Sequence, residues 1–417
     1  MNVSVVGGGV AGLCAAYYLR RAGADVTVLE ERRVGSGASW GNGGWITPAQ
    51  AGPLPEPGLL SYGLRSLVDP DSALYFEPHQ LARMLPWLVR FAARCNERDH
   101  ARGRLALGRL GQRCFELLDQ MVADGVALEL HRTGLVVAGQ VERSAEAFLA
   151  RMRPLSTFGF RVPESLLDGP ALRAIEPGLS DAVTVGFVLE QHWYVEPSAF
   201  VAALRDAVVA DGVELSEGEE VRDLDRAGSR VTALRTSQGV RRCDAVVLAT
   251  GAWLRPLARL VGARLPVEAG KGYSFSLRPA RMPRHPLMLL EPHVGCSPFP
   301  DRLRIAGTME FSGVNGRVDR RRIASIMRGV GQMLDGCASL DEDSVWSGLR
   351  PIAPDGLPII DRHPRLENVF FAGAYSTLGM TLAAPAGESL ARFVLSGSRP
   401  TELEPFRCTR FRVAGSV

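Results

Sequence analysis

The order of apolar and polar positions predicts a strand, a helix and a second strand at the start of the chain. Residues 2–6 form an almost continuous apolar run, residues 10–21 carry apolar side chains at helical spacing, and a second apolar run ends at Glu30. Glycines separate these segments at Gly7 and Gly23. Because continuous apolar runs suit strands that are buried on both faces, we expect a parallel sheet covered by helices.

Later segments repeat both kinds of pattern. Helical spacing recurs in four places, at about residues 80–96, 104–124, 198–212 and 320–334. Residues 51–80 are rich in proline and glycine and predict an extended excursion, whereas residues 126–139 predict a hairpin. Residues 183–197 predict a strand that ends at a proline, and residues 213–242 predict a short antiparallel meander.

Two distant segments have the same kind of pattern as residues 2–30, with an apolar strand followed by a glycine turn. Residues 245–251 form an apolar strand that ends in glycine, and residues 368–397 have the pattern of a strand, a glycine-rich turn and a helix. Since both belong with the first sheet, the chain leaves that sheet and comes back to it. We therefore expect two interleaved domains, the first from residues 1–50, 195–265 and 344–417, and the second, with a mostly antiparallel sheet, from residues 51–194 and 266–343.

Composition narrows the class of protein. The 417 residues are 46% hydrophobic and 22% charged, which is typical of a globular chain of two or three domains. The net charge of +3 is not gathered into a basic run, so no nucleic-acid partner is expected. Seven scattered cysteines without a Cys-x-x-Cys pair are typical of reduced thiols and indicate no metal site. No apolar run is long enough to span a membrane, so we expect a cytoplasmic protein, free or peripheral at the inner face of the membrane.

The stretch GGGVAG has the spacing of a dinucleotide-binding turn. Gly7, Gly9 and Gly12 lie between the first strand and the helix, and Glu30 ends the next strand. The glycines allow a tight turn and let backbone N–H groups approach a pyrophosphate, while the acid can accept a hydrogen bond from a ribose hydroxyl. Because an acid at this position disfavours the additional phosphate of NADP, FAD and NAD remain as candidates.

Three strand ends favour FAD over NAD. Residues 246–251 and 370–380 both end apolar strands in glycine turns, so three strand ends can converge on one long ligand. The loop SWGNGGWITP follows the second strand, where a flavin ring beyond the pyrophosphate would cross it, so we interpret its glycines as cofactor contacts rather than as a surface loop. The expected cofactor-binding residues are Gly7, Gly9, Val10, Ala11, Gly12, Glu30, Glu31, Ser36, Ser39, Asn42, Gly43, Gly44, Thr250, Gly251, Gly373, Leu378, Gly379, Met380 and Thr381.

Six stretches of the chain carry its most distinctive motifs. They are VVGGGVAG with its acid, GSGASWGNGGWITP, PVEAGKGYSFSL, RIAGTMEF, WSGLRPIAPDGLPIID and NVFFAGAYSTLGMTLAAPAGESLA. Together they resemble the FAD-dependent D-amino acid oxidase family, and most closely its D-amino acid dehydrogenase small-subunit branch, over nearly the whole chain. The resemblance implies an α/β fold in which the first domain is a Rossmann-type FAD-binding domain, interleaved with an α+β substrate domain built on a mostly antiparallel sheet.

The resemblance also implies a role for Arg350. In that family the arginine of the GLRP motif binds the substrate carboxylate, and a planar guanidinium suits this task because it offers two parallel N–H donors. The last helix would begin at Gly379 to Thr381, where its N–H groups would stabilise negative charge on the reduced flavin. Covalently flavinylated members carry a cysteine shortly after the arginine motif. Since none lies between Arg350 and Tyr375, we expect non-covalent FAD.

Four residues are candidates for the catalytic site, namely Arg350, Lys271, Tyr273 and Tyr375. Lys271 is the only lysine in the chain and is flanked by Gly270 and Gly272. Its compact ammonium could approach the flavin where a guanidinium would be too bulky, although a surface lysine retained by chance is an equal alternative. The two tyrosines could supply pocket hydroxyls or serve only in packing.

Two other features also leave alternatives open. His192 and Trp193 could line the pocket, but a hydrogen-bonded core histidine is the more ordinary interpretation. The helix at 80–96 could lie on an anionic membrane surface or pack on the substrate domain. Its apolar face holds Leu81, Met84, Leu85, Leu88 and Ala92, and its basic face holds Arg83, Arg90 and Arg94.

The expected function is FAD-dependent oxidative deamination of an amino acid, and by resemblance of a D-amino acid. A hydride would pass from the α-carbon to flavin N5, and water would hydrolyse the resulting imine to a keto acid. One alternative is an oxygen-using oxidase of a secondary amine such as sarcosine, of glycine, of a proline derivative or of a biosynthetic intermediate. Another is a flavin-binding subunit of a larger complex. The expected partners are a small amino acid or amine and an electron acceptor that is a quinone, a carrier protein or oxygen, with the oligomeric state open.

Overall fold

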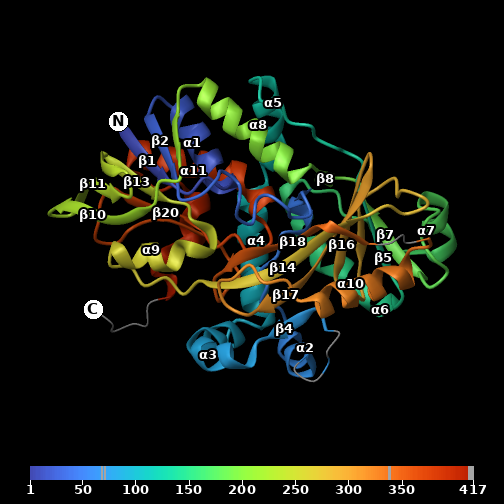
Figure 1. Cartoon of the computed structure of the whole chain (residues 1–417). Coiled ribbons are helices and arrows are strands. Elements are labelled where there is room, and N and C mark those ends of the chain that lie inside the picture. The colour runs from blue at the N-terminus through green and yellow to red at the C-terminus, as the bar shows by residue number, and fades with distance from the viewer. Residues whose placement is uncertain (67–68, 70–71, 337–339, 412–417) are drawn as a thin grey trace.

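The computed structural model describes residues 1–66, 69, 72–336 and 340–411, and two large sheets organise it (Figure 1). The first sheet has the strand order β19-β20-β13-β1-β2-β9. These strands are β1 (Asn2–Val6), β2 (Asp25–Glu30), β9 (Glu214–Glu217), β13 (Ala245–Leu248), β19 (Ile359–Arg362) and β20 (Val369–Gly373). Neighbours are parallel except β19, which runs antiparallel to β20. Strands from both ends of the chain therefore share one sheet, as their apolar character predicted.

Helices cover the first sheet because its strands carry apolar side chains on both faces. α1 (Val10–Arg21), α8 (Pro197–Ala210) and α11 (Gly379–Ser396) share a core with one face, and α4 (Glu97–Gly111) and α5 (Cys114–Ala123) extend that core. Gly387 lets α11 approach α1, since a Cβ there would lie 2.9 Å from the carbonyl carbon of Cys14. A smaller core on the other face contains α9 (Leu254–Leu260) and the meander β10 (Val221–Ala227), β11 (Arg230–Thr236) and β12 (Gly239–Arg242).

The second sheet is mostly antiparallel and has the order β18-β14-β17-β16-β15-β5-β7-β6, with β4 paired to β17. These strands are β4 (Leu74–Phe76), β5 (Leu135–Gly139), β6 (Leu167–Asp168), β7 (Val185–Leu189), β14 (Glu268–Leu277), β15 (Leu287–Leu289), β16 (Val294–Phe299), β17 (Arg302–Phe311) and β18 (Leu340–Ile352). Among the described strands of this second sheet, only the β15–β5 and β17–β4 pairs are parallel. α10 (Arg320–Met333) packs on one face through the core that contains Ile323 and Val330.

Shorter elements surround this sheet. They are α2 (Leu59–Ser66), α3 (Pro78–Ala92), α6 (Glu142–Met152), α7 (Gly169–Ile175) and the two-stranded sheet of β3 (Trp45–Ile46) and β8 (Trp193–Tyr194). α2 and α3 project together at the lower edge of the molecule in Figure 1. The expected α/β fold, with a mostly parallel sheet and a mostly antiparallel one, is confirmed. The residue boundaries of the two domains stay a prediction.

Three expected elements differ from the structure. Residues 126–139 do not form a hairpin, because β5 finds its neighbours in β7 and β15, which lie far away in the sequence. The helix expected at 104–124 divides into α4 and α5 at Gly111, a residue type with weak helix preference. The excursion at 51–80 contains α2 and β4. Within the described part of the chain, no helix is both long and apolar enough to cross a membrane.

Candidate active site

A pocket of about 520 Å³ lies where β1, β2, β13 and β20 end, at the edge where α/β sheets bind their ligands. Most of the expected site residues line it, although they come from distant parts of the sequence. These are Gly7, Gly9, Val10, Ala11, Glu30, Glu31, Ser36, Ser39, Asn42, Gly43, Gly44, Thr250, Gly251, Arg350, Gly373, Tyr375, Gly379 and Met380. The parallel register explains this gathering, since it brings all four carboxyl ends to one edge of the sheet.

The glycine turn after β1 has no room for side chains. Gly7 has a φ of +107°, and a Cβ there would lie 2.6 Å from the carbonyl oxygen of Ala249. Gly12 does not line the pocket, but a Cβ at this residue would lie 1.9 Å from the Gly7 carbonyl oxygen. Gly12 therefore allows α1 to begin directly against the turn, which leaves the first N–H groups of the helix beside the pocket.

Two side chains show that the pocket fits a dinucleotide. Glu30 accepts hydrogen bonds from the N–H of Gly8 at 2.8 Å and of Arg32 at 3.0 Å, one at each carboxylate oxygen. Each oxygen keeps a lone pair that can accept from a ribose hydroxyl. The Thr250 hydroxyl is buried, finds no hydrogen-bond partner in the described part of the chain and lines the same pocket, so a bound group can satisfy it. The acid and the glycine turn thus match the chemistry of the expected cofactor.

The glycine-rich loop 39–44 forms a wall of this pocket and is held at both ends. Ser39 Oγ accepts from the N–H of Val10 at 3.0 Å, which joins the loop to the start of α1. Asn42 Oδ1 accepts from the N–H of Gly44 at 2.7 Å, and Ser297 Oγ donates to the carbonyl of Gly43 at 2.6 Å. Because the loop bonds to the start of α1 and to the second sheet, it is a wall of the pocket and not a free surface loop.

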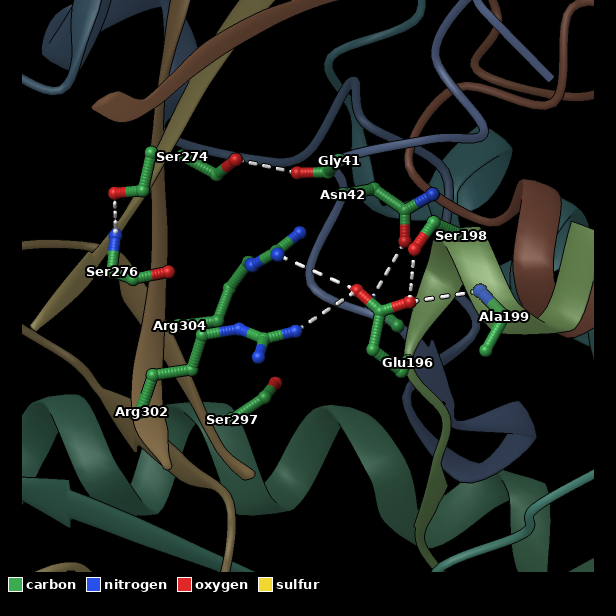
Figure 2. Close-up of polar contacts among 12 residues, drawn as sticks. Gly41, Asn42, Glu196, Ser198, Ala199, Ser274, Ser276, Ser297, Arg302 and Arg304 are labelled. Carbon is green, nitrogen blue, oxygen red and sulfur yellow. Dashed lines mark hydrogen bonds and ion pairs between the residues drawn. The ribbon is translucent and has the colours of Figure 1, made fainter. Parts of the chain in front are cut away.

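A charged cluster beside this loop joins the start of α8 to the second sheet. Glu196 precedes α8 and accepts from the N–H of Ala199 at 2.8 Å. Figure 2 shows two guanidinium groups of β17 converging on its carboxylate. Arg304 and Arg302 approach the Glu196 oxygen at 3.4 Å and 3.5 Å. In the same view Ser274 reaches the carbonyl of Gly41. These bonds fix the position of the second sheet against the glycine-rich loop and the start of α8.

Arg350, on β18, places a guanidinium with a lowered pKa in the lining of the pocket. Burial lowers the pKa of Arg350 to about 10, so the group is still a cation at neutral pH. Its Nη1 donates to the carbonyl of Thr308 at 2.6 Å, and it has no carboxylate partner among the described residues. A half-buried cation without a counter-ion among the described residues costs free energy, so the site is suited to an anionic ligand that would pair with it.

Tyr375 lies in the turn between β20 and α11, and the backbone on both sides of it is unusual. Ala374 and Ser376 have φ angles of +58° and +54°, which side-chain-bearing residues rarely adopt. The N–H of Ser376 donates to the carbonyl of Pro351 at 2.9 Å, so the turn is attached to the strand of Arg350. Burial raises the pKa of Tyr375, so its hydroxyl is protonated in the pocket and can donate a hydrogen bond.

Lys271 and Tyr273 are not brought to this pocket, which corrects our expectation for both. They lie on the opposite face of the second sheet and line a separate cavity of about 560 Å³. Lys271 Nζ is bonded to Glu310 Oε1, Asn315 Oδ1 and the carbonyl of Arg317, so it has no free donor to offer a flavin. The alternative of a surface lysine is also excluded, because Lys271 is 1% exposed.

Two cofactor candidates at the start of α11, Leu378 and Thr381, do not line the pocket. Leu378 is buried just before the helix, and Thr381 Oγ1 accepts from the N–H of Thr47 at 3.0 Å. The Thr381 hydroxyl lies 3.3 Å from the carbonyl of Trp45 as well. Thr381 therefore ties α11 to the segment after the glycine loop instead of contacting the pocket.

His192 is a core residue, but it is not hydrogen-bonded as a core histidine usually is. Both ring nitrogens lack a hydrogen-bond partner among the residues that the structure describes, and burial lowers the pKa of His192 to about 3. Its ring meets Trp45 edge to face at 5.1 Å, so it packs behind the pocket wall. Trp193 packs against Phe115 with ring centroids 4.3 Å apart, also away from the pocket.

Several residues that line the pocket were not found from the sequence. They include Trp45, Trp253, Gly295 and Ala306. Trp45 directly follows the glycine-rich loop, and this position is the sequence feature that could have identified it as a pocket residue. Gly295 comes from β16, outside the quoted motifs, whereas Ala306 comes from β17 within the RIAGTMEF stretch, where nothing marked it as a pocket residue. A Cβ at Gly295 would lie 2.8 Å from the Trp45 ring, so this glycine makes space for the indole.

Sequence comparison places the chain among flavoproteins. The family model described as FAD dependent oxidoreductase (DAO) matches residues 2–393. A protein of Methylobacterium radiotolerans named D-amino acid dehydrogenase is 33% identical over 410 residues, which cover 96% of this chain and 97% of the relative. A protein of the same name from Xylella fastidiosa (strain M12) is 30% identical, and the match covers 99% of this chain and 95% of the relative.

Solved structures share the fold. L-proline dehydrogenase from P. horikoshii has a TM-score of 0.77 at 18% identity, with 98% of this chain and 97% of that chain covered. Glycine oxidase from Geobacillus kaustophilus has a TM-score of 0.74 at 24% identity, with 99% of both chains covered. At these identities the two structures support the arrangement of the sheets, and they carry no conclusion about substrate.

Proposed function

The chain belongs to the FAD dependent oxidoreductase family, and from this premise we propose that it oxidises amino acids at the α-carbon, with D-amino acids as the substrate class. Two relatives of 33% and 30% identity that are named D-amino acid dehydrogenase support this substrate class. The α-carbon loses a hydride and the amine loses a proton, which gives an imine that water hydrolyses to a keto acid and ammonia. FAD, when bound, supplies the hydride acceptor.

The unpaired guanidinium of Arg350 carries the proposal. It lines the same pocket as the glycine turn and Glu30, so a carboxylate bound to it would lie in the cofactor pocket. Because Nη1 is held by the Thr308 carbonyl and Nη2 has no acceptor among the described residues, the fork keeps donors for a carboxylate. Such a two-point contact fixes the direction of the α-carbon as well as its distance.

Other groups of the chain complete the chemistry. Gly379 and Met380 open α11 at the pocket, so the positive end of that helix can stabilise negative charge there. The protonated Tyr375 hydroxyl can donate to a bound carboxylate. Ala306, on the sheet side of the pocket, is small and leaves space for a substrate side chain. No strong base is required, because a neutral amine can release its proton to water.

The proposal is tested by a substrate screen on the purified flavoprotein. Under anaerobic conditions, D-amino acids, L-amino acids, N-methyl amino acids and prolines are added one at a time, and bleaching of the flavin absorbance is followed. We expect D-amino acids to reduce the flavin fastest. If only sarcosine, glycine or prolines reduce it, the secondary-amine alternative replaces the proposal. If no amine does so, the subunit alternative replaces it.

Variants of Arg350 test the observation on which the proposal rests, namely that its guanidinium is available to bind a carboxylate. Arg350→Ala removes a charge that a bound ligand would cover and pair with, and such losses run to about 2–5 kcal/mol, or roughly 30- to 5,000-fold in kcat/KM. Arg350→Lys should recover only part of the loss, because a lysine lacks the fork. The flavin content of both variants is the control. An alanine variant that keeps its FAD and its kcat/KM would remove the basis of the proposal.

Turnover also requires an electron acceptor, and we propose a quinone or a carrier protein in preference to oxygen. The relatives' name, dehydrogenase, supports this choice. Reoxidation of the reduced protein in a stopped-flow instrument separates the cases. Fast reoxidation by a soluble quinone analogue with slow reoxidation by air supports a dehydrogenase, and the reverse result supports an oxidase. We also propose that FAD is held non-covalently, so acid should release it from the protein.

The surface of α2 and α3 supports a peripheral membrane contact. Met84, Trp87 and Phe91 are buried, so α3 packs on the second sheet, as one of the two alternatives expected. Four apolar side chains of the two helices are nevertheless well exposed, namely Leu60, Leu64, Leu85 and Val89, with Arg83 and Arg90 on α3. Apolar and basic groups together suit an anionic lipid surface. Co-sedimentation with phosphatidylglycerol vesicles, absent for Leu64→Glu/Val89→Glu, would support the contact.

A further inference from the structure

The one lysine of the chain lies in a buried network that the cofactor pocket does not use. Lys271 Nζ lies 3.1 Å from Glu310 Oε1, 2.7 Å from Asn315 Oδ1 and 3.0 Å from the carbonyl of Arg317. The second oxygen of Glu310 accepts from the hydroxyl of Tyr273. All three ammonium donors are therefore used, and both carboxylate oxygens are bonded. Burying an ion pair costs free energy because both charges lose their hydration. The network is therefore best explained by what it does for the rest of the molecule.

The network is attached to an irregular place in β17. The pairing of β14 with β17 runs Lys271 to Glu310 and then Tyr273 to Gly307. One residue of β14, Gly272, thus faces two residues of β17, which is a β-bulge. The first of those two, Thr308, has a φ of +66°. A β-branched residue in this conformation costs free energy, so surrounding contacts must hold it there.

The same bulge positions Arg350. The carbonyl of Thr308 accepts from Arg350 Nη1 at 2.6 Å, and Met309 Sδ lies 3.8 Å from the same nitrogen. The guanidinium occupies the place where a side chain of Gly272 would be, since a Cβ there would lie 2.2 Å from Nη2. The bulge therefore supplies the acceptor, and the glycine supplies the space.

We propose that the Lys271–Glu310–Tyr273 network is a positioning device for Arg350, which acts through the bulge of β17. Glu310 follows the bulge directly, and Lys271 joins it to Asn315 and Arg317 in the segment between β17 and α10. With these residues fixed, the strained Thr308 carbonyl stays aimed at Arg350. The inference rests on the proposed function of Arg350 as the carboxylate site, and it places the network one step away from the substrate.

This role explains why the residue is a lysine in a chain otherwise rich in arginine. A compact ammonium can meet three acceptors that surround it in a space where the side chain is 1% exposed. The planar guanidinium of an arginine carries its donors in a fork and would need a larger space. The neighbouring cavity of about 560 Å³ lies beside the network, but the ammonium is already saturated by protein acceptors.

Kinetics of the holoenzyme test the proposal. Lys271→Met and Glu310→Gln should raise the KM for a D-amino acid, by an amount on the order of 10- to 100-fold for a guanidinium displaced by about 1 Å. The limiting rate of flavin reduction should change less than the KM, and the FAD content should remain that of the parent protein. Tyr273→Phe removes one hydrogen bond of the network. It should also raise the KM more than it changes the limiting rate of flavin reduction, but by a smaller factor. This variant tests the proposal even if Lys271→Met and Glu310→Gln fold poorly.

A matched control separates positioning from stability. Asp361→Asn disrupts another buried ion pair, to Arg399, which lies away from the pocket. It should lower the Tm as the network variants do and leave the KM unchanged. If Lys271→Met, Glu310→Gln and Tyr273→Phe lower the Tm but leave the KM at the parent value, the network is only structural and the proposal is overturned.

A second measurement does not depend on the substrate being known. Isothermal titration calorimetry with propionate, and with neutral propionamide for comparison, reports on the carboxylate site directly. We expect propionate to bind the parent protein more tightly than propionamide and to lose this preference in Lys271→Met. If no amino acid reduces the flavin but the propionate preference still falls in Lys271→Met, the positioning role stands and the proposed substrate class fails. If the preference persists in that variant, the positioning role fails.

Discussion

Gly12 sets α1 directly against the turn that follows β1, since a Cβ at this residue would lie 1.9 Å from the carbonyl oxygen of Gly7. We predict that Gly12→Ala forces the helix away from the turn and withdraws its first N–H groups from the cofactor. The purified variant should therefore contain little FAD, measured as the ratio of flavin to protein absorbance. Gly331→Ala is the control, because nothing lies within 4 Å of a Cβ at that helical glycine. A Gly12→Ala protein that is purified with its full content of FAD would contradict this account of the turn.

His192 gives a pH-dependent prediction at the same scale. Burial lowers the pKa of His192 from 6.5 to about 3, so between these values the unfolded chain binds a proton that the folded chain does not. The free energy of unfolding therefore falls as the pH drops below 6.5, by up to about 1.4 kcal/mol per pH unit from this residue, until the pH nears 3. His192→Leu removes the effect and two unsatisfied nitrogens.

The measurement is chemical unfolding of both proteins between pH 7 and pH 4. We expect the advantage of His192→Leu over the parent protein to grow as the pH falls. Carboxylates contribute equally to both proteins, so the difference isolates the histidine. An advantage that is constant over this range would show that His192 does not lose its proton-binding capacity on folding.

At the scale of elements, the contact of α1 with α11 determines whether two helix N-termini reach one pocket. Gly387 makes the contact possible, because a Cβ there would lie 2.9 to 3.1 Å from backbone atoms of Cys14 and Ala15. We predict that Gly387→Ala costs about 1–3 kcal/mol of stability through overpacking, in spite of the better helix preference of alanine. FAD affinity should fall as well, since Val10 and Gly379 line the pocket.

Thermal unfolding and FAD titration of the apoprotein measure the two effects of Gly387→Ala. Gly331→Ala again serves as the control, since it changes the same residue type in a helix without a close neighbour. It should be neutral or stabilising. If both variants behave alike, the close approach of α1 and α11 carries no strain.

At the scale of the whole molecule, the cofactor pocket joins the beginning, the middle and the end of the chain. Its lining includes Gly7, Thr250, Arg350 and Gly379. FAD that binds only the folded protein stabilises it by about 2.7 kcal/mol at 100 times its Kd. We predict that removal of FAD lowers the Tm, that added FAD restores it in a concentration-dependent way, and that NAD does not. A Tm that is independent of FAD would contradict binding at this pocket.

Local patterns predicted the cofactor side of the molecule well. Strand, turn and helix at residues 2–21 follow from apolar periodicity and glycine positions, because both act through neighbours in the sequence. The same holds for the apolar strand at 245–248 and for the helix that begins at Gly379. Prediction was weaker at 126–139, where the apolar run suggested a hairpin. The partners of β5 are long-range strands, and the local pattern does not record which strand will pair.

The sequence by itself determined the glycine turn, its acid, the returning strands and the choice of Arg350, since each is a local motif or a family resemblance. Only the tertiary structure decided the surroundings of Arg350. Lys271 and Arg350 lie on neighbouring strands but on opposite faces, and the face depends on strand register, which a single residue shift reverses. The bulge at Thr308 is a shift of register by one residue in the pairing of β14 with β17. Neither strand carries a local sequence signal for it.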